Sequence, residues 1–121
     1  MFKRKQKTIT ITKEQYERIK AHIKHIGDTY YWMKNAASED NDGSMIKYWE
    51  EKTGIDLNSI TYTCPHCKKP MRRDQLDGSH VVKCDQPNGR QFITPLCQSF
   101  NRSKDKDTTF FVPKHLVIPA P

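Results

Sequence analysis

The stretch CPHC at residues 64–67, with ITPLCQSFNR at residues 93–102, decides the kind of fold to expect from this chain. A two-residue gap lets two thiolates point at one ion while the backbone turns tightly around it. A redox dithiol would need a thioredoxin-type strand and helix around it, and none is visible. The spacing therefore predicts a metal centre at Cys64 and Cys67, with Cys97 as the distant partner.

The fourth ligand of this centre is not evident from the spacing. Position 100, one helical turn after Cys97, is Phe100, which cannot coordinate a metal. Cys84 is the first candidate to complete the site, and His66 and His115 are further candidates. Each choice gives a tetrahedral zinc site, so structural zinc is the predicted cofactor. The alternative is that Phe100 fills the space by hydrophobic packing and no metal binds.

The segment DGSHV at residues 77–81, followed by the second cysteine stretch, resembles the HNH endonuclease superfamily in its small zinc-knuckle versions. The resemblance covers about residues 60–112. It implies a treble-clef (ββα) module, in which two strands and a helix surround a divalent ion. It also implies His80 as the general base and Asn101 as a ligand of a catalytic Mg or Mn ion. Asp77, three residues before His80, is the candidate to substitute for a second ligand of that ion.

The chain departs from the family pattern at two positions. Ser79 stands where the family commonly has a metal ligand, and Phe92 stands near the place of an asparagine that braces the base. We therefore predict a nucleic-acid-binding protein on a degenerate HNH-like module with weak or no catalysis, DNA being favoured over RNA. The alternative is a metal-dependent HNH endonuclease that hydrolyses phosphodiester bonds with His80 as general base.

The charge distribution favours a polyanionic partner. The formal net charge is +7, and residues 61–121 carry 10 Lys or Arg against 5 Asp or Glu. An excess of positive charge in the half of the chain that holds the cysteines suits a nucleic-acid partner. The expected contacts are Arg102, Lys104, Arg90, Lys68 and Lys69. No run approaches the length of a membrane span and no apolar segment follows the basic start, so we expect no membrane contact and a soluble, cytoplasmic protein.

The first half of the sequence favours helices. After a basic arm, the pattern at residues 12–15 is a capping box, and apolar residues then recur at steps of three and four up to Met33. This spacing predicts a helix over 13–36, and a second over 45–53 stopped by Gly54. The predicted fold is α+β: a basic arm and helical hairpin over 1–58, then the treble-clef module over 59–121.

The aromatic residues of this hairpin suggest a second alternative function. They would form the contact surface of a phage or mobile-element protein-interaction module, with a protein partner at Tyr30, Tyr31, Trp32 and Trp49.

Elsewhere, the stretch from Asp85 to Gly89 predicts a hairpin turn in which Asn-Gly provides positive φ angles. Short apolar strands are expected at 109–112 and 116–118.

Overall fold

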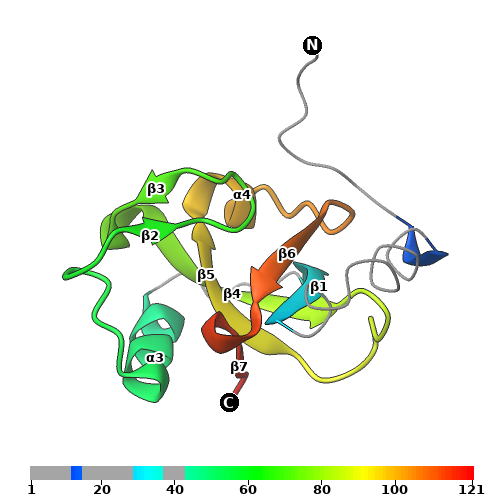
Figure 1. Ribbon diagram of the computed structural model, residues 1–121, viewed down its shortest axis with the longest axis horizontal. Coiled ribbons are helices and arrows are strands. Elements are labelled where there is room, and N and C mark those ends of the chain that lie inside the picture. Colours follow the sequence, from blue (N-terminus) through cyan, green and yellow to red (C-terminus); the bar gives the residue numbers. More distant parts are fainter. Residues whose placement is uncertain (1–11, 15–28, 37–42) are drawn as a thin grey trace, which may run out of the picture.

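The structure is a computed structural model that describes residues 12–14, 29–36 and 43–121. Its centre is a five-stranded antiparallel sheet in the order β6-β1-β4-β5-β7 (Figure 1). The five strands are β1 (Tyr30–Asn35), β4 (Leu76–Lys83), β5 (Phe92–Cys97), β6 (Thr109–Pro113) and β7 (Ile118–Pro119). A separate two-stranded sheet is formed by β2 (Tyr62–Thr63) and β3 (Pro70–Met71).

Two α-helices with defined ends accompany the strands in this part of the chain: α3 (Ser44–Thr53) and α4 (Gln98–Arg102). The predicted helix over 45–53 is confirmed. Gly54 ends it in the left-handed region at φ 74°, and its N–H donates to the carbonyl of Glu50. Short 3₁₀ turns are η2 (Arg73–Gln75) and η3 (Lys114–Leu116). A search of the described helices finds none with the length and apolar character needed to cross a membrane.

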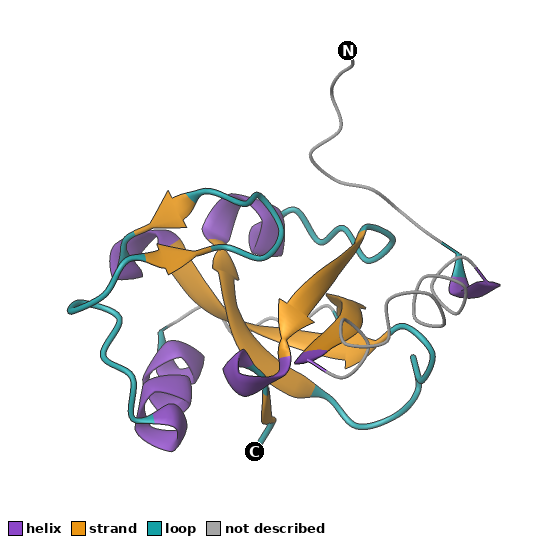
Figure 2. Cartoon of the chain, in the orientation of Figure 1, coloured by secondary structure: helices purple, strands orange, loops and turns teal. Residues whose placement is uncertain are grey.

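The predicted fold class is wrong. In place of an N-terminal helical hairpin and a treble-clef module, the described chain is built around an antiparallel sheet, with two short helices beside it (Figure 2). Tyr30–Asn35, expected as the end of the first helix, is strand β1 and pairs with β6 on one side and β4 on the other. Consecutive aromatic residues fit a half-buried strand well, and hydrogen bonds on both edges override the helical spacing. The predicted arm over 1–11 and most of that helix, 15–28, lie outside the described residues.

The aromatic surface predicted for a protein partner is not assembled. Trp32 and Trp49 are buried, at 5% and 0% exposure, within the packed interior. Trp49 also donates its indole N–H to the carbonyl of Leu116 at 2.9 Å. Both tryptophans therefore serve the interior of the fold.

The sheet has two packed faces, because side chains alternate along each strand. The α3 face carries Leu76, Gly78, His80 and Ile93, and helix α3 packs on it through Ile46 and Trp49. The α4 face carries residues of the other parity, and Phe100 of helix α4 packs among them. These residues are Met33, Asp77, Val81, Leu96, Phe110 and Val112.

The chain after β4 follows the predictions in part. The strand predicted over 109–112 is confirmed as β6, whereas in the one over 116–118 Leu116 ends the turn η3 and only Ile118 lies in a strand, β7. The loop between β4 and β5 turns where Gly89 N–H donates to the carbonyl of Gln86 at 2.9 Å. The prediction of positive φ at Asn88 and Gly89 is wrong, because this longer loop does not require the two-residue turn that needs such angles.

Gly78 provides a test of the contact between α3 and the sheet. A Cβ at this position would lie 2.5 Å from the carbonyl carbon of Met45 and 2.6 Å from the nitrogen of Ile46. Both atoms are backbone and cannot rotate away. We expect Gly78→Ala to lower the free energy of unfolding by about 1–3 kcal/mol, measured by urea denaturation.

Gly89→Ala is the matched control, since its nearest contact is 3.1 Å in an exposed loop. It should change stability by no more than about 0.5 kcal/mol. Equal effects of the two substitutions would show that α3 does not press against β4 as described.

Candidate metal centre

The first two cysteines lie in a tight turn between β2 and β3. Cys64 follows β2 directly, its carbonyl accepts from Lys68 N–H at 2.9 Å, and its own N–H donates to the carbonyl of Lys69 at 3.0 Å. Lys68 adopts φ 62°, a left-handed conformation that is uncommon for a residue with a side chain. These bonds fold the backbone around Cys64 and Cys67 as the spacing predicts.

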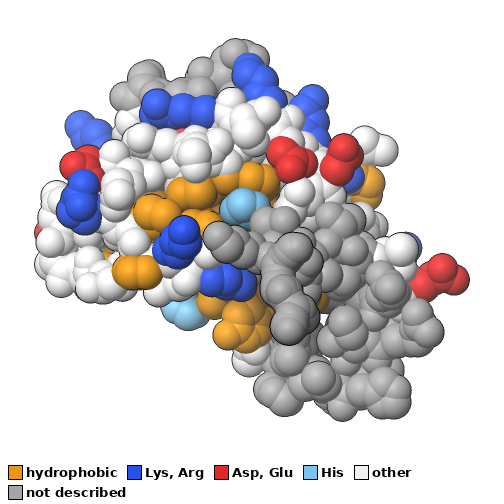
Figure 3. Space-filling model, turned by 90° about the horizontal axis from the view of Figure 1, so that it is seen from above, with side chains coloured by type: hydrophobic (Ala, Val, Ile, Leu, Met, Phe, Trp, Pro, Cys, Tyr) orange, Lys and Arg blue, Asp and Glu red, His pale blue; other side chains and the backbone are white. Residues whose placement is uncertain are grey.

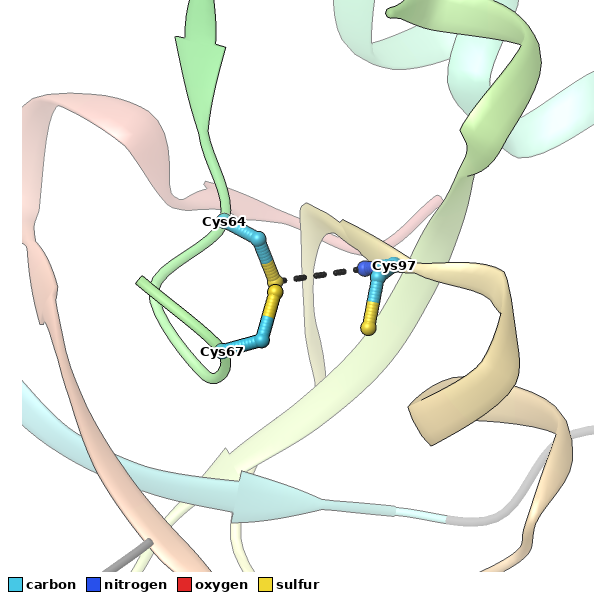
Figure 4. Close-up of side chains that lie close together, drawn as sticks. All are labelled: Cys64, Cys67 and Cys97. Carbon is cyan, nitrogen blue, oxygen red and sulfur yellow. Dashed lines mark hydrogen bonds between the residues drawn. The ribbon is translucent and has the colours of Figure 1, made fainter. Parts of the chain in front are cut away.

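The third cysteine comes from a different part of the fold. Cys97 is the last residue of β5 and stands immediately before α4, opposite Leu76 in the sheet. Its N–H donates to the sulfur of Cys64 at 3.3 Å, the contact drawn as a dashed line in Figure 4. This bond joins the small β2–β3 sheet to the main sheet at one buried point.

The three thiols form a compact cluster. The sulfur atoms of Cys64, Cys67 and Cys97 all lie within 4.8 Å of one another, and all four cysteines of the chain are unpaired. Figure 4 shows the side chains of Cys64 and Cys67 directed toward each other. Sulfurs bound tetrahedrally at about 2.3 Å from one zinc ion lie about 3.8 Å apart, so a small contraction suffices. The cluster can hold a metal ion.

The thiols perturb one another electrostatically. The hydrogen bond with Cys64 lowers the pKa of Cys97, and a hydrogen bond from the His66 side chain lowers it further. The same Cys64–Cys97 bond, with burial, raises the pKa of Cys64. A metal that binds both sulfurs must displace any proton they carry, because thiolates are the ligands.

The other predicted ligand positions do not join this cluster. Cys84 follows the far end of β4, eight residues beyond the partner of Cys97, which is about 26 Å along a strand. Burial raises the pKa of the Cys84 thiol to about 12. Phe100 is buried at 6% exposure and packs edge-on against Phe110. This is the hydrophobic packing that the alternative interpretation predicted for Phe100.

The predicted catalytic residues are separated by the sheet. Asp77 and Asn101 meet on the α4 face, where Asn101 Nδ2 donates to Asp77 Oδ2 at 3.0 Å. His80 is three residues along β4 from Asp77, so its side chain projects from the opposite, α3 face. Among the residues that the structure describes, the cysteine cluster is the one group in which three or more His, Cys, Asp or Glu side chains lie close enough together to share a metal ion.

Asp77 anchors helix α4. Arg102 donates to both carboxylate oxygens, from Nε and Nη2 at 2.9 Å each, and the Asp77 side chain is only 5% exposed. Asn35 extends the network by donating to Asn101 Oδ1 at 3.3 Å. Two residues predicted to bind a catalytic ion, and one predicted to bind nucleic acid, are thus engaged with one another.

The remaining predicted nucleic-acid contacts are exposed. Lys68 and Lys69 lie in the cysteine turn, Lys104 follows α4, and Arg90 lies in the loop between β4 and β5. Figure 3 shows Lys and Arg side chains grouped around a central hydrophobic area on one face of the molecule. The burial of these four residues is therefore consistent with a surface position, as the prediction requires.

Comparison with known proteins identifies no relative. No family model, no curated protein and no solved structure matches the chain. The resemblance to the HNH superfamily therefore stays a prediction, and the site has to be interpreted from its own geometry.

Two groups of residues were not found from the sequence. One is the stacked pair His66 and Phe100 beside the cysteines. The other, named here the aromatic–lysine cluster, consists of Tyr31, Lys83, Phe92 and Lys114. The consecutive aromatics at 30–32 were a signal for a strand, but the partners of Tyr31 come from three distant segments that only the strand pairing brings together.

Metal binding is tested by single cysteine substitutions. We expect about one metal ion per chain, measured by elemental analysis of protein purified under reducing conditions. Cys64→Ser and Cys97→Ser should abolish tight binding, because two sulfurs remain. Cys84→Ser should leave the metal content unchanged, since this thiol is far from the cluster. Loss of metal in the Cys84 variant, or retention in the other two, would contradict the assignment.

The Asp77 network is tested by its effect on stability. Asp77→Asn removes the charge that receives two hydrogen bonds from Arg102, and we expect a loss of about 1–3 kcal/mol in the free energy of unfolding. Asp74→Asn is the control, because the Asp74–Arg72 pair is fully on the surface, with side chains 74% and 76% exposed. Such exposed pairs contribute little. Similar losses of stability in both variants would show that Asp77 does not anchor α4.

Proposed function

We propose that this chain is a nucleic-acid-binding protein whose cysteine cluster holds a structural zinc ion. The observation that carries the proposal is the aromatic–lysine cluster. Its four residues come from β1, β4, β5 and η3, so the fold itself assembles them. All four are only partly buried.

The cluster combines two stacked rings with two ammonium groups. The ring centroids of Tyr31 and Phe92 lie 6.3 Å apart at an angle of 30°. Lys83 Nζ lies 4.5 Å from the Tyr31 centroid and 5.4 Å from that of Phe92, and Lys114 Nζ lies 5.1 Å from Tyr31. Neither lysine forms an ion pair among the described residues. Two ammonium groups thus share one aromatic ring, and no described carboxylate neutralises either of them.

A single-stranded nucleic acid offers what this cluster lacks. Its phosphates would neutralise the two ammonium groups, and its bases would stack on the rings that these groups now cover. Cation–π contacts at a surface contribute only about 0.5–1 kcal/mol, so displacing them costs little. The excess of positive charge in residues 61–121 supports the same class of partner.

Zinc is the metal we propose for the cluster. Thiolate ligands select soft metals, and a buried three-sulfur set beside a tight cysteine turn suits zinc in a structural role. Bound there, zinc would join the β2–β3 turn to the junction of β5 and α4. Such a site needs reduced cysteines, in keeping with the cytoplasmic location expected from the sequence.

Catalysis is not part of this proposal. The general base expected from the family resemblance, His80, projects from the α3 face, away from Asp77 and Asn101. Asp77 is already hydrogen-bonded by Asn101 and Arg102. A divalent ion would have to break this network before it could polarise a phosphate.

Binding is tested by fluorescence anisotropy with labelled single-stranded DNA, single-stranded RNA and duplex DNA of equal length. We expect Lys83→Ala/Lys114→Ala to weaken single-strand binding and to reduce the slope of log K against log salt by about 1.4, from two phosphate contacts. Tyr31→Leu should cost about 1–3 kcal/mol of binding free energy with the slope nearly unchanged.

The matched control is Lys47→Ala/Lys52→Ala on helix α3. It removes the same charge, and Lys52 makes a similar contact with a ring, 5.5 Å from the Tyr48 centroid. This variant should keep most of the affinity. If both double variants lose the same affinity and slope, the binding is non-specific electrostatics and the aromatic–lysine cluster is not the site.

A further inference from the structure

The cysteine cluster leaves one coordination position of a tetrahedral ion open. Zinc in structural sites takes four protein ligands, and the cluster supplies three. Cys84 is remote, and Phe100, one turn after Cys97, has no donor atom. Among the described residues, a fourth protein ligand must therefore come from a side chain close to these sulfurs.

His66 is held at that place by aromatic packing. It stands between Cys64 and Cys67 in the turn, and its imidazole stacks on Phe100 with centroids 3.7 Å apart and planes 10° from parallel. The ring of Phe110 meets it edge-on at 6.2 Å. Phe100, which stands where a metal ligand was expected, thus holds the imidazole of His66 in place.

The imidazole has an unused buried nitrogen. His66 Nδ1 is shielded from solvent and has no hydrogen-bond partner, an arrangement that costs about 1–3 kcal/mol. His66 lies between two cysteines of the cluster in the turn, and the Phe100 ring on which it stacks follows Cys97 by three residues. Its nitrogens are not within 4.8 Å of all three sulfurs, so ligation requires the side chain to move toward them.

We propose that His66 is the fourth protein ligand, which makes the centre a three-cysteine, one-histidine site closed to solvent ligands. This inference rests on the proposed zinc ion but is independent of nucleic-acid binding. The competing role is a hydrogen bond from His66 to the Cys97 thiolate, with water as the fourth ligand. The two roles differ in which atom contacts the metal.

His66→Phe separates ligation from packing. Phenylalanine keeps the ring stacked on Phe100 but removes both nitrogens, so the variant should still fold. His115→Phe is the control, because His115 is exposed and lies outside the cluster. X-ray absorption of the zinc-loaded proteins reports the ligands directly, since a bound imidazole adds outer-shell scattering that water lacks.

We expect imidazole scattering in the wild type and the His115 variant, and its loss in His66→Phe. The zinc dissociation constant of His66→Phe should rise by at least about tenfold, although the loss of an outer-shell hydrogen bond has an effect of this size too. The spectrum therefore decides. A wild-type spectrum without imidazole scattering would overturn the assignment, and so would an unchanged spectrum in His66→Phe.

A wild-type chain that binds no zinc would overturn the metal centre as well. Anisotropy on the same samples keeps the two proposals apart. Single-strand binding that depends on Tyr31 and Lys83 would support the proposed function whatever the fourth ligand is.

Discussion

The register between β4 and β5 is the constraint on which the rest of the structure depends. Leu76 lies opposite Cys97 and Asp77 opposite Leu96. In this register Cys97 ends its strand beside the cysteine turn, and the Asp77 carboxylate lies under α4. A shift of one residue would turn each side chain of the strand to the other face. Asp77 would then face α3, and a larger side chain would replace Gly78 against the backbone of Met45.

The cysteine cluster and the carboxylate network lie on two sides of the same junction, where β5 passes into α4. Just before α4 begins, Cys97 donates its N–H to the sulfur of Cys64. Where the helix ends, Arg102 donates to the carboxylate of Asp77. A five-residue helix is too short to be stable alone. Its position is set by contacts at both ends and by Phe100 between them. Position 100, where a fourth ligand was expected, thus holds a core residue whose ring stacks on His66.

The elements that could be predicted from the sequence are those set by neighbouring residues. The helix before Gly54 has its end signal within one turn, and the cysteine turn is fixed by a two-residue gap. Strand β1 could not be predicted in this way, because its upstream residues carry helical spacing and its partners lie far along the chain. Cys84 failed as a ligand for a similar reason: proximity in sequence to the other cysteines gave no information about the length of β4. The opposite faces of Asp77 and His80 follow from strand alternation, but only once the strand is known to be regular through Gly78.

The pairing of β1 with β6 has a consequence for synthesis of the protein. Tyr30 pairs with Pro113 and Lys34 with Thr109, so these contacts join positions 83 and 75 residues apart (113 − 30 and 109 − 34). On the ribosome, the aromatic strand emerges long before its neighbour exists. Until then a β-prone segment exposes an unpaired edge, the kind of surface that associates with other chains. Completion of the sheet must wait for β6, which makes the nascent chain, rather than the finished protein, the form more exposed to association with other chains.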